Sequence, residues 1–130
     1  MKPFFITLII AGLLFINCNA QKSEKVKTIA TIEFKKKLEN TEKPQLVDVR
    51  SPEEFNAEHL KNAININWNN PDFEEKIKSL NKDKPIFVYC KAGGRSIKAA
   101  ARLADLGFIQ IYNLDGGIMS WDSENLLIKN

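Results

Sequence analysis

A cysteine followed by two cations and two glycines stands in the segment 89–96, whose sequence is Tyr-Cys-Lys-Ala-Gly-Gly-Arg-Ser. Glycine permits backbone angles that are closed to other residues, so the amide N–H groups of such a loop can turn inward and form an anion-binding nest. A thiolate on Cys90 would be stabilised by those amides, by the start of the next helix, and by Lys91 and Arg95. The pattern predicts a nucleophilic cysteine with a depressed pKa.

The alternative is that Cys90 is a small core residue at the end of a strand. The two glycines and two cations favour chemistry, because the same cradle would hold a persulfide anion whose outer sulfur extends towards the centre of the loop. We therefore expect Cys90 to be catalytic. The expected substrate-binding residues are Lys91, Ala92, Gly93, Gly94, Arg95 and Ser96.

The hydrophobic pattern predicts the elements that position this loop. The apolar run 86–89 indicates a buried strand directly before Cys90. A helix is expected from about Arg95 until Gly107 closes it, with an apolar stripe at Ile97, Ala100, Ala101 and Ala104. In open α/β sheets, ligands bind beyond the carboxyl ends of the strands, which is where this order places Cys90.

The rest of the chain also alternates between strand and helix signals. Strands are expected at 27–30, 45–49, 63–66 and 109–112. Thr31 is a plausible N-cap, Ser51 to Glu54 form a capping box after a buried strand, and Asn70-Pro71 starts another helix. This alternation predicts an α/β fold with a mostly parallel sheet and helices on both faces.

Three motifs, in order, resemble those of one family. Cys-x-x-Gly-x-Arg-Ser at 90–96 is similar to the active-site loop of single-domain rhodaneses. The segment 46–55, Leu-Val-Asp-Val-Arg-Ser-Pro-Glu-Glu-Phe, with His59-Leu60, resembles the family's first signature. Leu-Asp-Gly-Gly-Ile at 114–118, with Trp121, resembles its C-terminal signature. The resemblance covers 27–130 and implies a rhodanese-like three-layer sandwich.

The resemblance implies a sulfurtransferase that needs no metal or organic cofactor. The Cys90 thiolate would attack the outer sulfur of an anionic donor such as thiosulfate, and the persulfide would pass sulfur to a thiol acceptor, small or protein. Asp48 and Arg50 resemble the family's structural pair, and Arg50 is expected to bind a carboxylate such as Glu53 or Glu54. His59 and Trp121 are expected to serve as a hydrogen-bonded turn residue and a packing residue.

Two other functions stay open. Phosphatases and arsenate reductases on this fold have a longer loop between Cys and Arg, whereas four residues intervene here, which favours sulfur. A persulfide carrier or a non-catalytic binding module is the other alternative. Retention of Cys90 argues against an inactive module but does not exclude a carrier.

The first twenty residues are typical of an export signal. Lys2 precedes the apolar stretch 4–16, which is shorter than the ~20 residues of a membrane-spanning helix. Cleavage before Gln21 would release a periplasmic protein, whereas lipidation of Cys18 would anchor it to a membrane. We expect a tether at 21–26 and one domain at 27–130.

Composition excludes several classes of function. The formal net charge of +3 gives no indication of a nucleic-acid partner. The chain has two cysteines and one histidine, too few soft ligands for a metal site. Loss of the leader would leave Cys90 as the only cysteine able to react in the folded domain.

Overall fold

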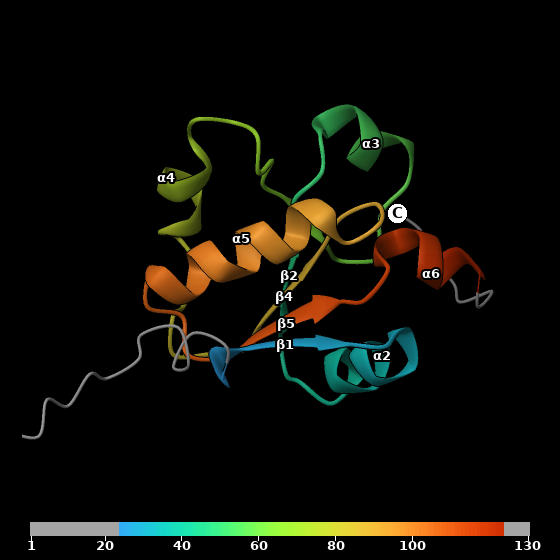
Figure 1. Cartoon of the computed structure of the whole chain (residues 1–130), viewed down its shortest axis with the longest axis horizontal. Helices are drawn as coiled ribbons and strands as arrows, with labels where there is room; N and C mark the ends of the chain where they lie inside the picture. The colour runs from blue at the N-terminus through green and yellow to red at the C-terminus, as the bar shows by residue number, and fades with distance from the viewer. Residues whose placement is uncertain (1–23, 124–130) are drawn as a thin grey trace, which may run out of the picture.

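A five-stranded parallel sheet runs through the part of the chain that the computed structural model describes, residues 24–123 (Figure 1). Its strands, in spatial order, are β1 (Val26–Ile29), β5 (Ile111–Leu114), β4 (Ile86–Tyr89), β2 (Gln45–Asp48) and β3 (Ile64–Asn65). The sheet therefore places β4, the strand before the cysteine loop, at its centre.

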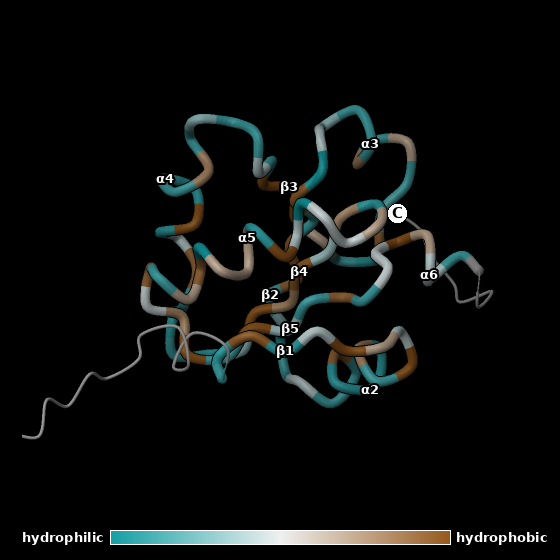
Figure 2. The backbone as a smooth tube through the Cα atoms, viewed as in Figure 1, coloured by the Kyte–Doolittle hydropathy of each residue, from teal (hydrophilic) through white to brown (hydrophobic). Residues whose placement is uncertain are grey.

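Helices cover both faces of the sheet. They are α2 (Thr31–Glu39), α3 (Pro52–Ala57), α4 (Phe73–Ile77), α5 (Gly94–Asp105) and α6 (Gly117–Ser123). One buried core joins the sheet to α4 and α5, and a second joins it to α2 and α6 with Phe55 of α3 packed against it. Hydrophobic stretches gather along the central strands, whereas the outer loops are mostly hydrophilic (Figure 2). The predicted three-layer α/β sandwich is confirmed.

The central strand positions the cysteine loop. All four residues of β4 are fully buried, as an apolar run covered on both faces should be. Tyr89 at its end pairs with Asp48 at the end of β2, and Val88 pairs with Asn113 of β5. Because the three strands are parallel, the segments that follow them meet at one edge of the sheet, and all three sequence motifs contribute to that edge.

The buried face of α5 differs from the expected stripe. Ile97 is 41% exposed and Ala101 is also exposed, so this part of the prediction was wrong. The helix instead buries Ser96, Ala99, Ala100, Leu103 and Ala104. This face has the same i, i+3, i+4, i+7 spacing, and it buries Leu103 as well as the Ser96 hydroxyl that contacts the cysteine sulfur.

Helix and strand ends agree with the sequence in some places and differ in others. Ser51 and Glu54 form the predicted capping box, and Gly107 follows α5 with φ of +101°. Thr31 is not an N-cap, because Ala30 holds that position and Thr31 is the first helical residue. The last strand begins at Ile111, two residues later than the start expected at residue 109.

The predicted leader at 1–20 and the first three residues of the tether lie outside the described residues. The rest of the predicted tether differs from expectation, because Glu24 and Lys25 are helical and Val26 already begins β1. Within residues 24–123, no helix combines the length and apolar character needed to cross a membrane.

Truncation of the two branched side chains on α5 should separate its buried and exposed faces. Leu103→Ala should lower the free energy of unfolding by about 2–5 kcal/mol, because it removes a fully buried side chain. Ile97→Ala on the same helix should lower the free energy of unfolding by less than about 1 kcal/mol. Urea denaturation of both variants measures this, and equal losses would contradict the assignment of the faces.

Candidate active site

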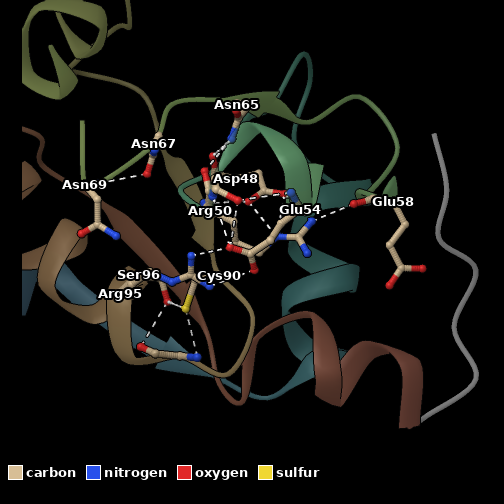
Figure 3. A network of polar contacts seen from close by, with 12 residues as sticks. Asp48, Arg50, Glu54, Glu58, Asn65, Asn67, Asn69, Cys90, Arg95 and Ser96 are labelled. Atoms are coloured by element: carbon tan, nitrogen blue, oxygen red, sulfur yellow. Dashed lines mark hydrogen bonds and ion pairs between the residues drawn. The ribbon is translucent and has the colours of Figure 1, made fainter. Parts of the chain in front are cut away.

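Cys90 is buried at the carboxyl end of β4, with 1% of its surface exposed. Its Sγ accepts a hydrogen bond from the Gly93 backbone N–H at 3.0 Å and lies 3.4 Å from Ser96 Oγ. Gly93 has φ of +109°, a conformation that side-chain-bearing residues rarely adopt. Figure 3 shows the sulfur pointing toward Ser96 at the start of α5. The loop therefore wraps around the thiol as the sequence predicted.

The start of α6 holds the other side of the loop. The N–H groups of Ile118 and Met119 donate to the carbonyls of Cys90 and Lys91 at 2.9 and 3.1 Å. A Cβ atom on Gly117 would lie only 2.4 Å from the Lys91 carbonyl oxygen, so no larger residue fits without a backbone shift. The C-terminal motif therefore fixes the backbone of the cysteine loop.

The pKa of Cys90 is lowered, through opposing effects. Burial raises the pKa by opposing the charged form, but hydrogen bonds from the Ser96 hydroxyl and from the amides of Ser96, Gly93 and Arg95 outweigh it. Among residues 24–123, no side-chain cation hydrogen-bonds to Sγ. The loop amides and the Ser96 hydroxyl therefore make the largest contributions that lower the pKa of Cys90. The charge of Arg95 also interacts with Cys90, as the sequence predicted, although it does not hydrogen-bond to Sγ.

Arg95 pairs with Glu54 instead of facing the sulfur directly. Its two terminal nitrogens donate to the two carboxylate oxygens at 2.6 and 3.0 Å (Figure 3). Glu54 also accepts from the backbone and hydroxyl of Ser51, as the capping box requires. The hydrogen bonds from Arg95 lower the pKa of Glu54 to about 2, and those from Ser51 contribute despite partial burial. Glu54 thereby joins the start of α3 to the cysteine loop.

Asp48 and Arg50 form a buried ion pair that corrects one expectation. Arg50 Nη2 lies 2.7 Å from Asp48 Oδ2 and also donates to the Glu58 carbonyl at 2.7 Å. The prediction that Arg50 binds Glu53 or Glu54 was wrong. Arg50 binds the carboxylate of Asp48, two residues before it, whereas Glu54 is already engaged by Arg95.

The structure also places the other three residues that the sequence singled out. His59 contacts the Phe55 carbonyl through Nδ1 at 2.9 Å and stacks on the Phe55 ring. Trp121 is buried and packs edge-on against Phe34. Lys91 is exposed beside the cysteine.

A cavity of about 450 Å³ gives access to the cysteine. Its lining includes Cys90 and three residues that the sequence did not single out, Trp68, Asn69 and Lys98. Lys98 was accessible to sequence reasoning, since it lies one helical turn after Gly94, but Trp68 carries no local signal. A larger cavity of about 510 Å³, lined by Leu38, Leu46 and Trp121 among others, does not include the cysteine. Within residues 24–123, no cluster of His, Cys, Asp and Glu could hold a metal ion.

Comparison with known proteins assigns the family. Residues 31–124 match the model of the rhodanese-like domain. The putative sulfurtransferase YtwF of Bacillus subtilis is 35% identical over 100 residues, which cover 77% of this chain and 94% of that protein. The thiosulfate sulfurtransferase GlpE of Shewanella oneidensis is 37% identical over 81 residues, covering 62% of this chain and 78% of that protein.

The fold comparison agrees. A rhodanese-like domain protein from Staphylococcus aureus superposes with a TM-score of 0.67 at 35% identity, over 80% of this chain and 99% of that one. The chain belongs to the rhodanese-like sulfurtransferase family.

The Glu54–Arg95 pair predicts a pH dependence of stability. The folded pKa of Glu54 is about 2, below its ordinary value of 4.5. The stabilisation is therefore complete above pH 4.5 and is lost as the pH falls towards 2. Glu54→Gln should lower the free energy of unfolding by only about 1 kcal/mol at neutral pH, because the ion pair is partly exposed and therefore screened by solvent.

Urea denaturation from pH 7 to pH 3 measures this difference, which should shrink below pH 4.5. Glu53→Gln is the matched control, because that neighbouring carboxylate is exposed and forms no ion pair within residues 24–123. A Glu54→Gln loss that stays constant down to pH 3 would contradict the assignment.

Proposed function

We propose that this protein transfers sulfane sulfur from thiosulfate or a related anionic donor to a thiol acceptor through a persulfide on Cys90. The observation that carries the proposal is the Cys90 sulfur itself, held by the Gly93 amide and 3.4 Å from the Ser96 hydroxyl at the end of a buried strand. These groups stabilise a thiolate, which is the reactive form of cysteine.

The first half-reaction is a displacement at sulfur. The Cys90 thiolate attacks the outer sulfur of thiosulfate, a new S–S bond forms, and the original S–S bond breaks with its electron pair leaving on sulfite. The amides that surround Sγ would then face the persulfide. In the second half-reaction, an acceptor thiolate takes the outer sulfur and the thiolate of Cys90 returns.

The size of the loop supports sulfur over phosphorus. The four residues from Lys91 to Gly94 separate the cysteine from Arg95, and the Gly93 amide already reaches to 3.0 Å from Sγ. A tetrahedral oxyanion needs a wider ring of donors around it. The Arg95 guanidinium is also engaged by Glu54, which leaves it less available to clamp a phosphate. Phosphatase and arsenate reductase activity are therefore the weaker alternatives.

A persulfide carrier that serves a partner protein uses the same Cys90 chemistry, and it remains the nearest alternative. We also propose that the protein is exported to the periplasm, by cleavage before Gln21 or by lipidation of Cys18. Export is supported by the composition of residues 1–20 alone.

Formation of the persulfide is the direct test of the function. Incubation of the purified protein with thiosulfate should raise its intact mass by about 32 Da, because one sulfur atom is retained on Cys90. Reduction should remove the increment, and Cys90→Ser should never gain it. Addition of cyanide should then yield thiocyanate. Faster, Cys90-dependent hydrolysis of an aryl phosphate would refute the proposal.

The hydroxyl next to the sulfur should control the reactivity of the thiol. Alkylation of Cys90 by iodoacetamide should show a pH midpoint below the free-thiol value of about 8.5. Ser96→Ala should raise that midpoint, because the hydrogen bond from Ser96 is the largest of the contributions that lower the pKa of Cys90.

Ser79→Ala provides the matched control, since that hydroxyl bonds only to the Lys76 carbonyl on an exposed helix end. Lys91→Ala should raise the midpoint less than Ser96→Ala, and salt should mask its effect. A midpoint that Ser96→Ala leaves unchanged would show that the amides alone set the thiol pKa.

A further inference from the structure

The cavity beside Cys90 extends beyond the cysteine loop. The loop contributes one wall, and Trp68, Asn69 and Lys98 contribute the rest. Trp68 is fixed in place, because its backbone N–H donates to the Val49 carbonyl at 3.0 Å and its ring packs edge-on against Phe73. The indole is therefore a preformed, partly exposed wall next to the reacting sulfur.

The charges that line this cavity are all positive. Lys91 and Lys98 have no ion-pair partner within residues 24–123, and no carboxylate contributes to the lining. A second cavity, of about 370 Å³, lies on the other side of Lys91. Its lining has three acidic residues, Glu54, Glu58 and Asp122, and two basic ones, Lys91 and the Arg50 that is paired with Asp48. Of the two cavities, only the second has carboxylates in its lining, so an anionic molecule is favoured on the Trp68 side.

The volume also exceeds what the donor needs. Thiosulfate has five heavy atoms, whereas a cavity of about 450 Å³ lies in the range that holds small organic molecules. An apolar indole wall adds nothing to the binding of a small inorganic anion, but it favours contact with a carbon chain. Cations together with an aromatic wall fit an organic molecule that carries carboxylates.

We propose that this cavity is the acceptor subsite, and that it selects low-molecular-weight thiols bearing carboxylate groups, with Lys98 as the residue that attracts the carboxylate. The inference rests on the proposed persulfide chemistry and deepens it by naming the class of acceptor. Lys98 lies outside the cysteine loop and does not contact Sγ, so its role concerns acceptor selection and not thiol activation.

The transfer step explains why cations are needed. The acceptor thiolate RS⁻ forms a bond to the outer sulfur of the Cys90 persulfide, and the bond from that sulfur to Sγ breaks with its electron pair staying on Sγ. An anionic persulfide and RS⁻ give the Cys90 thiolate and RSS⁻, so charge and atoms balance. Because two anions must meet, nearby ammonium groups favour the encounter.

A two-stage experiment separates this inference from the proposed function. The purified protein is loaded with thiosulfate, excess donor is removed, and loss of the increment of about 32 Da is followed after addition of a thiol. The acceptors are mercaptosuccinate, which has two carboxylates, and neutral 2-mercaptoethanol. Each variant is compared with the wild type on the same thiol, so differences in thiol basicity cancel.

Lys98→Ala should slow transfer to mercaptosuccinate by about threefold to tenfold and transfer to 2-mercaptoethanol by less than about twofold, since one exposed cation is partly screened. Lys98→Glu should slow transfer to mercaptosuccinate further, and high salt should reduce the slowing in both variants. Lys84→Ala is the matched control, because that exposed lysine lies before the amino end of β4, whereas Cys90 follows the carboxyl end of the same strand.

Three results would overturn the subsite: unchanged transfer to mercaptosuccinate in Lys98→Ala, equal slowing of both thiols, or the same loss in Lys84→Ala. Failure to gain the increment during loading is a different outcome. It would refute the persulfide itself, and the acceptor subsite with it.

Discussion

The geometry of the site depends on how closely two backbone segments approach each other. Gly117 lies so near the Cys90–Lys91 peptide that a Cβ would come within 2.5 Å of both carbonyl oxygens. This close approach lets the backbone N–H groups of Ile118 and Met119, at the start of α6, donate to those same carbonyls. With the carbonyls turned towards α6, the amides of Gly93, Arg95 and Ser96 remain to face the sulfur. Packing at Gly117 thus influences the electrostatics of a cysteine that lies 27 positions earlier in the chain.

The buried position of Cys90 presents a conflict that the loop resolves. A cysteine with 1% exposure would ordinarily be a neutral core residue, because burial raises the pKa of a thiol. Hydrogen bonds from the surrounding amides and from Ser96 reverse that direction. Burial then becomes useful, since it restricts access to the sulfur to the cavity that it lines and strengthens each donor in a drier environment.

Local patterns predicted the parts of this site that depend on neighbours in sequence. The buried strand β4, the capping box at Ser51 and the turn at Gly107 all have short-range causes, and the structure has them. The Arg95–Glu54 pair joins residues 41 positions apart, and no local pattern contains it. The buried face of α5 was misassigned because alanines can occupy either the buried or the exposed face of a helix. The orientation of α5 instead buries Leu103 and places the hydroxyl of Ser96 beside the sulfur.

The cations around the site divide by chemistry into two groups. Arg50 and Arg95 each bind a carboxylate through more than one nitrogen, and these pairs tie the strand end and α3 to the cysteine loop. The planar guanidinium suits such fixed, bidentate contacts, whereas the ammonium of lysine is a mobile point charge. Lys91 and Lys98, which line the cavity, have no ion-pair partner within residues 24–123. A pair that must hold a loop in place cannot also release its carboxylate to receive a substrate. The arginines therefore maintain the architecture, and the lysines are left as the charges that an arriving anion can meet.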